Sequence, residues 1–306
     1  MQTVATAILR PSAKSALHGR RLPLLCFTLL VALVVFNLLH AGLARQDKLM
    51  IGAPGALLFA AGFDGFLDDW SLYEGTQRAT IVNGELELAV NAAQTAAWST
   101  AQYNFGDFDM QVRARAVAGP VDNGLGIVFR LNDARGDGCE LPAIVLCGLE
   151  ALLPLAGAAL RQTLVAAPAD RYYAFLISSD GFYSLWQAEA GSARLRSAWI
   201  ASPHIRQGLD AENVIRVVGA GGTFRFMING APAVLCLPDA ADGASTYYAG
   251  ECLGGAMSDK FVDDSLSSGA LGVIVQSTAS GGGGVVARFD RALVYAPGER
   301  SEDASL

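Results

Sequence analysis

From Leu58 onward, hydrophobic and polar residues alternate along the chain in short segments that end at Gly, Asn or Asp. A period of two is typical of half-buried strands, and frequent turn residues indicate antiparallel connections. The segments 79–82 and 85–90 flank Asn83-Gly84, a strong signal for a tight hairpin. Further strands are expected at 108–117, 125–131, 172–178, 183–188, 214–218, 223–228, 271–276 and 285–295. The pattern predicts an all-β fold, a two-sheet antiparallel jelly-roll sandwich.

Two stretches interrupt this alternation. Residues 132–170 include Gly148 to Val165, which is rich in Leu and Ala and carries only Glu150 and Arg161 as charged side chains. Residues 236–268 consist mainly of Asp, Ala, Gly, Ser and Tyr. Both stretches are expected to be insertions carried on loops. The first is too apolar for a solvated loop, so it packs on its own sandwich, docks a partner or touches the bilayer beside the anchor.

The amino terminus differs in character from the rest of the chain. Residues 22–44 contain no Asp, Glu, Lys or Arg, and Arg21 and Arg45 flank them. A helix of this length spans about 34 Å, enough to cross a bilayer core of about 30 Å. The four basic residues before it predict a cytoplasmic amino terminus and an exported remainder. A cleaved signal peptide is the alternative, because Gly42-Leu43-Ala44 offers small residues.

We therefore expect one membrane-tethered, bacterial-type extracytoplasmic domain. The expected parts are a cytoplasmic basic segment (1–21), a transmembrane signal anchor (22–44), a linker (45–57), the sandwich (58–297) and a flexible tail (298–306). The whole chain has 22 basic and 29 acidic residues; without residues 1–44 it keeps 18 basic residues and a net charge of −11. The acidic balance argues against nucleic acid as a partner.

Four of the five cysteines lie in the exported part. They are Cys139, Cys147, Cys236 and Cys252. An even number in an exported domain predicts two disulfides, and local pairs, 139 with 147 and 236 with 252, are the simplest connectivity. Pairing between the two insertions stays open. A zinc site is the alternative, but no C-x-x-C pair occurs and His204 is the only histidine beyond the apolar segment, so we expect no metal and no cofactor.

An ordered succession of short motifs resembles a known family. The motifs include Phe63-Asp64-Gly65, Asn83-Gly84-Glu85-Leu86, Phe105-Gly106-Asp107-Phe108, Gly124-Leu125-Gly126-Ile127, Asp180-Gly181-Phe182-Tyr183 and Ile228-Asn229-Gly230. Over roughly residues 58–297, apart from the insertions, they resemble the concanavalin A-like lectin/glucanase jelly rolls, in particular the family 16-like and 3-keto-disaccharide hydrolase-like domains. The resemblance implies two curved antiparallel sheets and a concave face that often takes polysaccharide.

The sequence contains two pairs of acidic residues that are candidates for catalytic carboxylates. Retaining glycosidases need two carboxyl groups about 5 to 5.5 Å apart. The glucanases of the resembled fold carry E-x-D-x-x-E on one strand, a run that does not occur here. Glu85 with Glu87 and Asp107 with Asp109 are the acid pairs in strand-like surroundings. The first pair fits a solvated strand face and Asp107 fits a turn, so we predict no catalytic residue.

A binding face is predicted instead. On the strand 110–117, Met110, Val112, Ala114 and Ala116 should face the core, which leaves Gln111, Arg113 and Arg115 on the opposite face. The same parity places Arg130 outward, and Trp186 has the opposite parity to Tyr183 and Leu185. Arginine forks beside an aromatic ring suit sugar hydroxyls, carboxylates and the apolar side of a pyranose.

These observations favour a membrane-anchored, non-catalytic binding module whose expected ligand is a glycan or a cell-surface protein. A glycoside hydrolase or related sugar-active enzyme is one alternative. A structural subunit of a membrane or cell-surface assembly, docked through the apolar insertion, is the other.

The mature protein should retain residues 22–44, because the segment is long enough to span and has the correct charge asymmetry. Amino-terminal sequencing of the membrane fraction checks this. A mature chain that begins at Arg45 would show a cleaved signal peptide instead.

Overall fold

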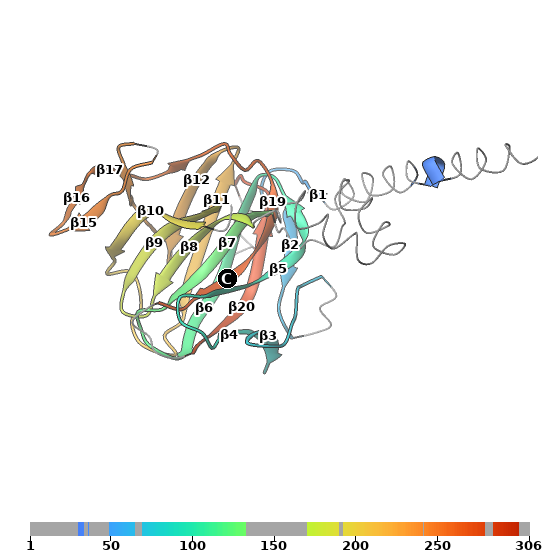
Figure 1. Ribbon diagram of the computed structural model, residues 1–306, viewed down its shortest axis with the longest axis horizontal. Coiled ribbons are helices and arrows are strands. Elements are labelled where there is room, and N and C mark those ends of the chain that lie inside the picture. The colour runs from blue at the N-terminus through green and yellow to red at the C-terminus, as the bar shows by residue number, and fades with distance from the viewer. Residues whose placement is uncertain are drawn as a thin grey trace, which may run out of the picture.

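The computed structural model describes residues 30–33, 36, 49–64, 69–132, 170–189, 192–240, 242–278 and 284–299. In this part of the chain, two large antiparallel sheets lie face to face (Figure 1). Helix within it is confined to residues 30–33 and 36, and none of the described helical residues forms a span long and apolar enough to cross a bilayer. Most of the predicted anchor and the first insertion, with Cys139 and Cys147, lie outside the described residues.

The first sheet, here called sheet A, is built from strands spread over most of the chain. Its order is β1 (Leu49–Met50), β5 (Ala96–Phe105), β19 (Gly269–Gln276), β7 (Gly124–Asn132), β8 (Arg171–Ser178), β9 (Phe182–Glu189) and β10 (Ser192–Ala201). Neighbours pair antiparallel except β1 and β5, which run parallel. The non-sequential order around β19 is typical of a jelly-roll-like sandwich.

Sheet B covers the other side of the core. Its order is β13 (Ala231–Pro232), β12 (Thr223–Ile228), β11 (Asn213–Ala220), β6 (Phe108–Ala118), β20 (Val285–Tyr295), β4 (Glu85–Val90) and β3 (Gln77–Val82), with β18 (Phe261–Val262) beside β12 and β2 (Leu57–Ala61) beside β20. The predicted linker therefore contains β1 and the first residue of β2. The all-β antiparallel sandwich is confirmed for the described residues.

The hydrophobic core lies between the two sheets. On β6 the predicted parity is confirmed, because Met110, Val112, Ala114 and Ala116 are at most 3% exposed. Aromatic rings join the sheets: the rings of Phe175 on β8 and Phe226 on β12 stack with centroids 4.6 Å apart. Such contacts bury large apolar areas and fix the spacing of the two layers.

The second insertion, 236–268, is more ordered than the expected loop. It contains β14 (Leu235–Pro238) paired with β17 (Gly255–Ser258), and β15 (Thr246–Tyr248) paired with β16 (Glu251–Leu253). We call residues 235–258 the arm, which projects from one end of the sandwich (Figure 1). A disulfide joins Cys236 to Cys252 across it, the local pair that the spacing favours. The covalent link closes a 16-residue separation, so it restricts a segment that has little core of its own.

The prediction that Arg130 faces outward is wrong. Its side chain is fully buried instead of facing outward, because a register shift between Phe129 and Asn132 breaks the strand parity and gives Arg130 a positive φ of 55°. The guanidinium group donates to the backbone oxygens of Ser267, of Gly221 at 2.9 Å and of Phe105 at 3.4 Å.

Two aromatic rings enclose the same guanidinium. Its carbon lies 5.7 Å from the ring centroid of Phe108 and 5.6 Å from that of Phe224. Burial lowers the pKa of Arg130, and the carboxylate of Asp107, 3.9 Å away, opposes that effect. A buried arginine with these partners stabilises the structure only while its hydrogen bonds are made.

Arg130→Met should therefore reduce the free energy of unfolding by roughly 3 kcal/mol, because three backbone oxygens lose the donor that the buried guanidinium supplies. Arg225→Ala, at an exposed position of β12, is the matched control and should change stability by no more than about 0.5 kcal/mol. Urea unfolding measures both. Equal, small effects would show that Arg130 is dispensable.

Candidate ligand-binding site

The outer face of sheet A is apolar and aromatic. Val128, Ala174, Leu176 and Ile274 point away from the main core, yet each is at most 2% exposed. Half-buried side chains pack against them, and we call the four largest, Trp98, Tyr172, Trp186 and Trp199, the aromatic face. The outer face of an antiparallel sheet is ordinarily polar, so this apolar and aromatic face is a candidate binding surface.

Strand register explains how this surface is assembled. On β8, Ala174 lies opposite both Trp186 and Val128, and on β19, Ile274 lies opposite both Gly126 and Trp98. A Cβ atom at Gly126 would come within 2.0 Å of the Phe175 carbonyl oxygen, so no side chain fits there. The position of Gly126 therefore leaves space on this face between the strands that carry the large rings.

The rings hold fixed positions. Trp98 and Tyr172, from strands on either side of β19 and β7, approach with ring centroids 5.2 Å apart and an interplanar angle of 50°. The indole nitrogen of Trp186 donates to the Ser184 hydroxyl oxygen at 2.9 Å. Because neighbours fix these side chains, a ligand would meet surfaces that are already oriented.

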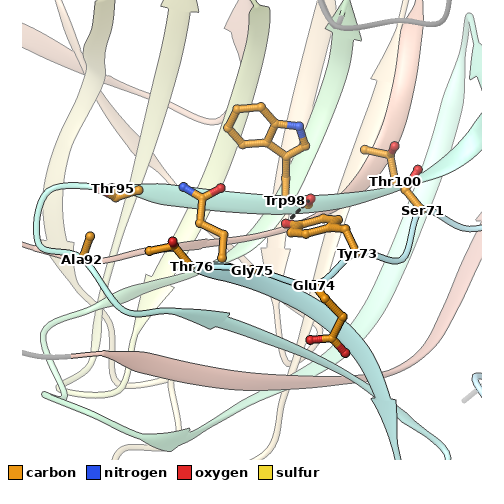
Figure 2. A pocket seen from close by; sticks show the side chains of 10 residues that line it. Ser71, Tyr73, Glu74, Gly75, Thr76, Ala92, Thr95, Trp98 and Thr100 are labelled. Atoms are coloured by element: carbon orange, nitrogen blue, oxygen red, sulfur yellow. Dashed lines mark hydrogen bonds between the residues drawn. The ribbon is translucent and has the colours of Figure 1, made fainter.

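A pocket of about 400 Å³ adjoins the aromatic face at Trp98. Its walls are β5 and the segment 71–77 that runs beside it (Figure 2). Two hydrogen bonds fasten that segment to β5: the Ser71 amide donates to the Thr100 oxygen at 2.9 Å, and the Tyr73 hydroxyl donates to the Trp98 oxygen at 2.9 Å. We call this the Trp98 pocket.

The lining of the Trp98 pocket combines one indole ring with short polar groups. It consists of Ser71, Tyr73, Glu74, Gly75, Thr76, Gln77, Ala92, Thr95, Trp98 and Thr100. Hydroxyl and amide groups offer both donors and acceptors, and Glu74 is the one charged side chain among these lining residues. In Figure 2 the Glu74 carboxylate points away from the Trp98 ring. This composition suits a neutral, hydroxyl-rich ligand with an apolar side.

The structure separates the residues of the predicted binding face. Trp186 lies on the outer face of sheet A, Arg130 is buried, and Gln111, Arg113 and Arg115 lie on β6 in sheet B. The prediction that these residues share one surface is wrong, because it applied strand parity without knowing which sheet each strand joins.

The outer face of sheet B carries a network of ion pairs. Arg115 bonds Glu85 at 2.6 Å, and Glu87 accepts hydrogen bonds from Arg78 at 2.7 Å and Arg288 at 3.0 Å. The hydrogen bond to Glu85 raises the pKa of Arg115 against the opposing effect of burial. Glu85 and Glu87 thus neutralise arginines that strand pairing places side by side on β6 and β20.

The second acid pair also has structural partners. Asp109 is buried and holds the Arg216 guanidinium in two bonds, at 2.7 and 2.6 Å. Asp107 accepts a bond from the Gly221 amide at 2.7 Å. Within the described residues, no group of three His, Cys, Asp or Glu side chains is placed to hold a metal ion.

Sequence reasoning missed Trp98, Tyr172 and Trp199 as site residues. Two of them lie on β5 and β10, strands that the alternation did not reveal because both are rich in Ala and Ser. Tyr172 lies on a predicted strand. A usable signal was present on β5, where Trp98 alternates with Ala97 and Ser99, which are both buried.

Comparison with known proteins finds structural similarity at low sequence identity. No protein-family model and no curated protein matches the chain. A galectin-like-fold protein of unknown function from Bacillus subtilis is 13% identical, with a TM-score of 0.49 over 82% of this chain and 100% of that one. A carbohydrate-binding module from Bacillus subtilis is 11% identical, with a TM-score of 0.44 over 74% of this chain and 95% of that one.

A β-glucanase from Bacillus licheniformis is 8% identical, with a TM-score of 0.44 over 81% of this chain and 100% of that one. Identities and scores this low carry no functional argument.

Burial raises the pKa of Tyr172 to about 12, and the nearby Asp170 carboxylate adds to the effect. The folded state therefore keeps a proton that the unfolded state loses near pH 10, so this residue's contribution to stability falls as the pH rises from about 10 to 12. Tyr172→Phe should flatten the pH dependence of the unfolding free energy in that window. Tyr248→Phe, whose ring is 72% exposed, is the control. An unchanged slope in Tyr172→Phe would contradict the assignment.

Proposed function

We propose that this chain is a non-catalytic binding module for carbohydrate, and that the sugar binds at the Trp98 pocket and across the aromatic face. The single observation that supports this most is the placement of Trp98. This residue contributes both to the aromatic outer surface of sheet A and to the lining of a pocket that carries hydroxyl and amide groups.

The chemistry of a pyranose fits this arrangement. One side of the ring presents C–H groups that stack on an aromatic surface, and the equatorial hydroxyls need donors and acceptors around the rim. Ser71, Thr76, Gln77, Thr95 and Thr100 supply such groups beside the indole. Trp186 and Trp199, farther along the same face, offer further stacking positions for a ligand longer than one sugar.

The carboxylates favour binding over hydrolysis. A retaining glycosidase needs a second carboxyl group close to the first. Glu74 is the carboxylate among the described lining residues, and the acid pairs 85/87 and 107/109 serve the ion pairs and hydrogen bonds given above.

For its location, we propose a single-pass membrane protein with its domain outside the cytoplasm. The apolar segment 22–44 and the basic residues before it support this placement. Docking of a cell-surface partner on the first insertion stays a prediction from the sequence.

Trp98→Ala and Trp186→Ala should each weaken glycan binding by about 1 to 3 kcal/mol, roughly 5- to 150-fold in Kd, because each removes a large aromatic contact. A glycan array identifies the ligand, and calorimetry then measures the variants. Circular dichroism checks that each variant is folded.

Arg113→Ala is the matched control, because Arg113 lies on the outer face of sheet B and should leave Kd unchanged. The reverse pattern, with binding lost in Arg113→Ala and kept in both tryptophan variants, would move the site to sheet B. Release of reducing sugar by the wild type would indicate the hydrolase instead.

A further inference from the structure

The N-terminal edge of the sandwich, residues 49–57, exposes more apolar surface than a solvated edge should. Ile51 is 80% exposed, Leu57 54% and Leu49 41%. No charged side chain occurs anywhere in the run Leu-Met-Ile-Gly-Ala-Pro-Gly-Ala-Leu. Clustered exposed apolar residues of this kind mark a contact surface.

This edge is held firmly on the domain. Leu49 and Met50 pair with Asn104 and Phe105 of β5. The Gly55 amide donates to the Ala296 oxygen at 3.0 Å, and the Ala296 amide donates to the Ala56 oxygen at 2.8 Å. The exposed side chains therefore keep a fixed orientation relative to both sheets and cannot turn inward to escape water.

The chain before this edge limits what can cover it. Leu49 follows the apolar segment 22–44 by five residues, and five fully extended residues span at most about 18 Å. The polar layer on each side of a bilayer is about 5 to 7 Å thick. If residues 22–44 cross a membrane, β1 must lie close to its surface. The four residues between that segment and Leu49, Arg45-Gln46-Asp47-Lys48, are all polar and carry one net positive charge, which suits a headgroup layer.

We propose that the N-terminal edge contacts the phospholipid headgroup layer, so that the domain stands on the membrane in one orientation. This inference rests on the membrane anchoring proposed above and is independent of glycan binding. The arm serves as the internal comparison, because it projects from the side of the sandwich opposite β1 (Figure 1) and also exposes apolar side chains, including Tyr248 and Met257.

The test uses the full-length chain in phosphatidylcholine–phosphatidylglycerol vesicles that contain a phospholipid with a diazirine near the headgroup. After illumination, mass spectrometry of tryptic peptides locates the lipid adducts. We expect adducts on peptide 49–78, which carries the edge, and several-fold fewer on peptide 226–260, which carries the arm. Ile51→Asp should reduce adducts on peptide 49–78 several-fold.

Tyr248→Asp is the matched control and should leave the adducts on peptide 49–78 unchanged. Both replaced side chains are mostly exposed, so both variants should fold, which circular dichroism checks.

Equal labelling of edge and arm would overturn the proposal, as would failure of the chain to remain in the vesicles. Edge-to-edge cross-links between two chains, in place of lipid adducts, would assign the surface to a second copy. Glycan binding is measured on the same vesicles. Loss of glycan binding would contradict the proposed function, whereas loss of lipid adducts at residues 49–57 would contradict only the membrane contact.

Discussion

The buried guanidinium of Arg130 is the interaction on which one end of the sandwich depends. Its three carbonyl partners belong to the end of β5, to the turn between β11 and β12, and to the segment before β19. One side chain thus joins backbone oxygens that belong to both sheets and to the segment before β19. The positive φ of Arg130 is the local cost of turning a strand residue inward, and the hydrogen bonds offset it.

The faces of the two sheets carry different chemistry. The inner faces form the apolar core, and the outer face of sheet B pairs its arginines with carboxylates, which leaves it polar but largely neutralised. The outer face of sheet A instead presents tryptophan and tyrosine around the aliphatic side chains of Val128, Ala174, Leu176 and Ile274. A ligand that stacks on rings would therefore distinguish the two sides of the molecule without any net attraction by charge.

Much of the fold could be predicted from the sequence, because alternation along β6, β11 and β12 reflects burial on one face. The predicted parity of Met110 to Ala116 is confirmed for that reason. The candidate site could not be predicted to the same extent. Arg130 follows a register shift, and the sheet that each strand joins depends on pairings between distant segments, such as β5 with β19. The alternation of hydrophobic and polar residues along one strand indicates neither a register shift nor the partner of that strand.

The four tryptophans are divided between two environments. Trp70 is 2% exposed and packs against Phe59 and Phe63, whereas Trp98, Trp186 and Trp199 are half-buried on the outer face of sheet A. The protein therefore carries two intrinsic fluorophore populations, one sensitive to unfolding of the core and the other to the polarity of a surface. A molecule that covers the aromatic face would change the emission of the second population while the native packing around Trp70 stays intact.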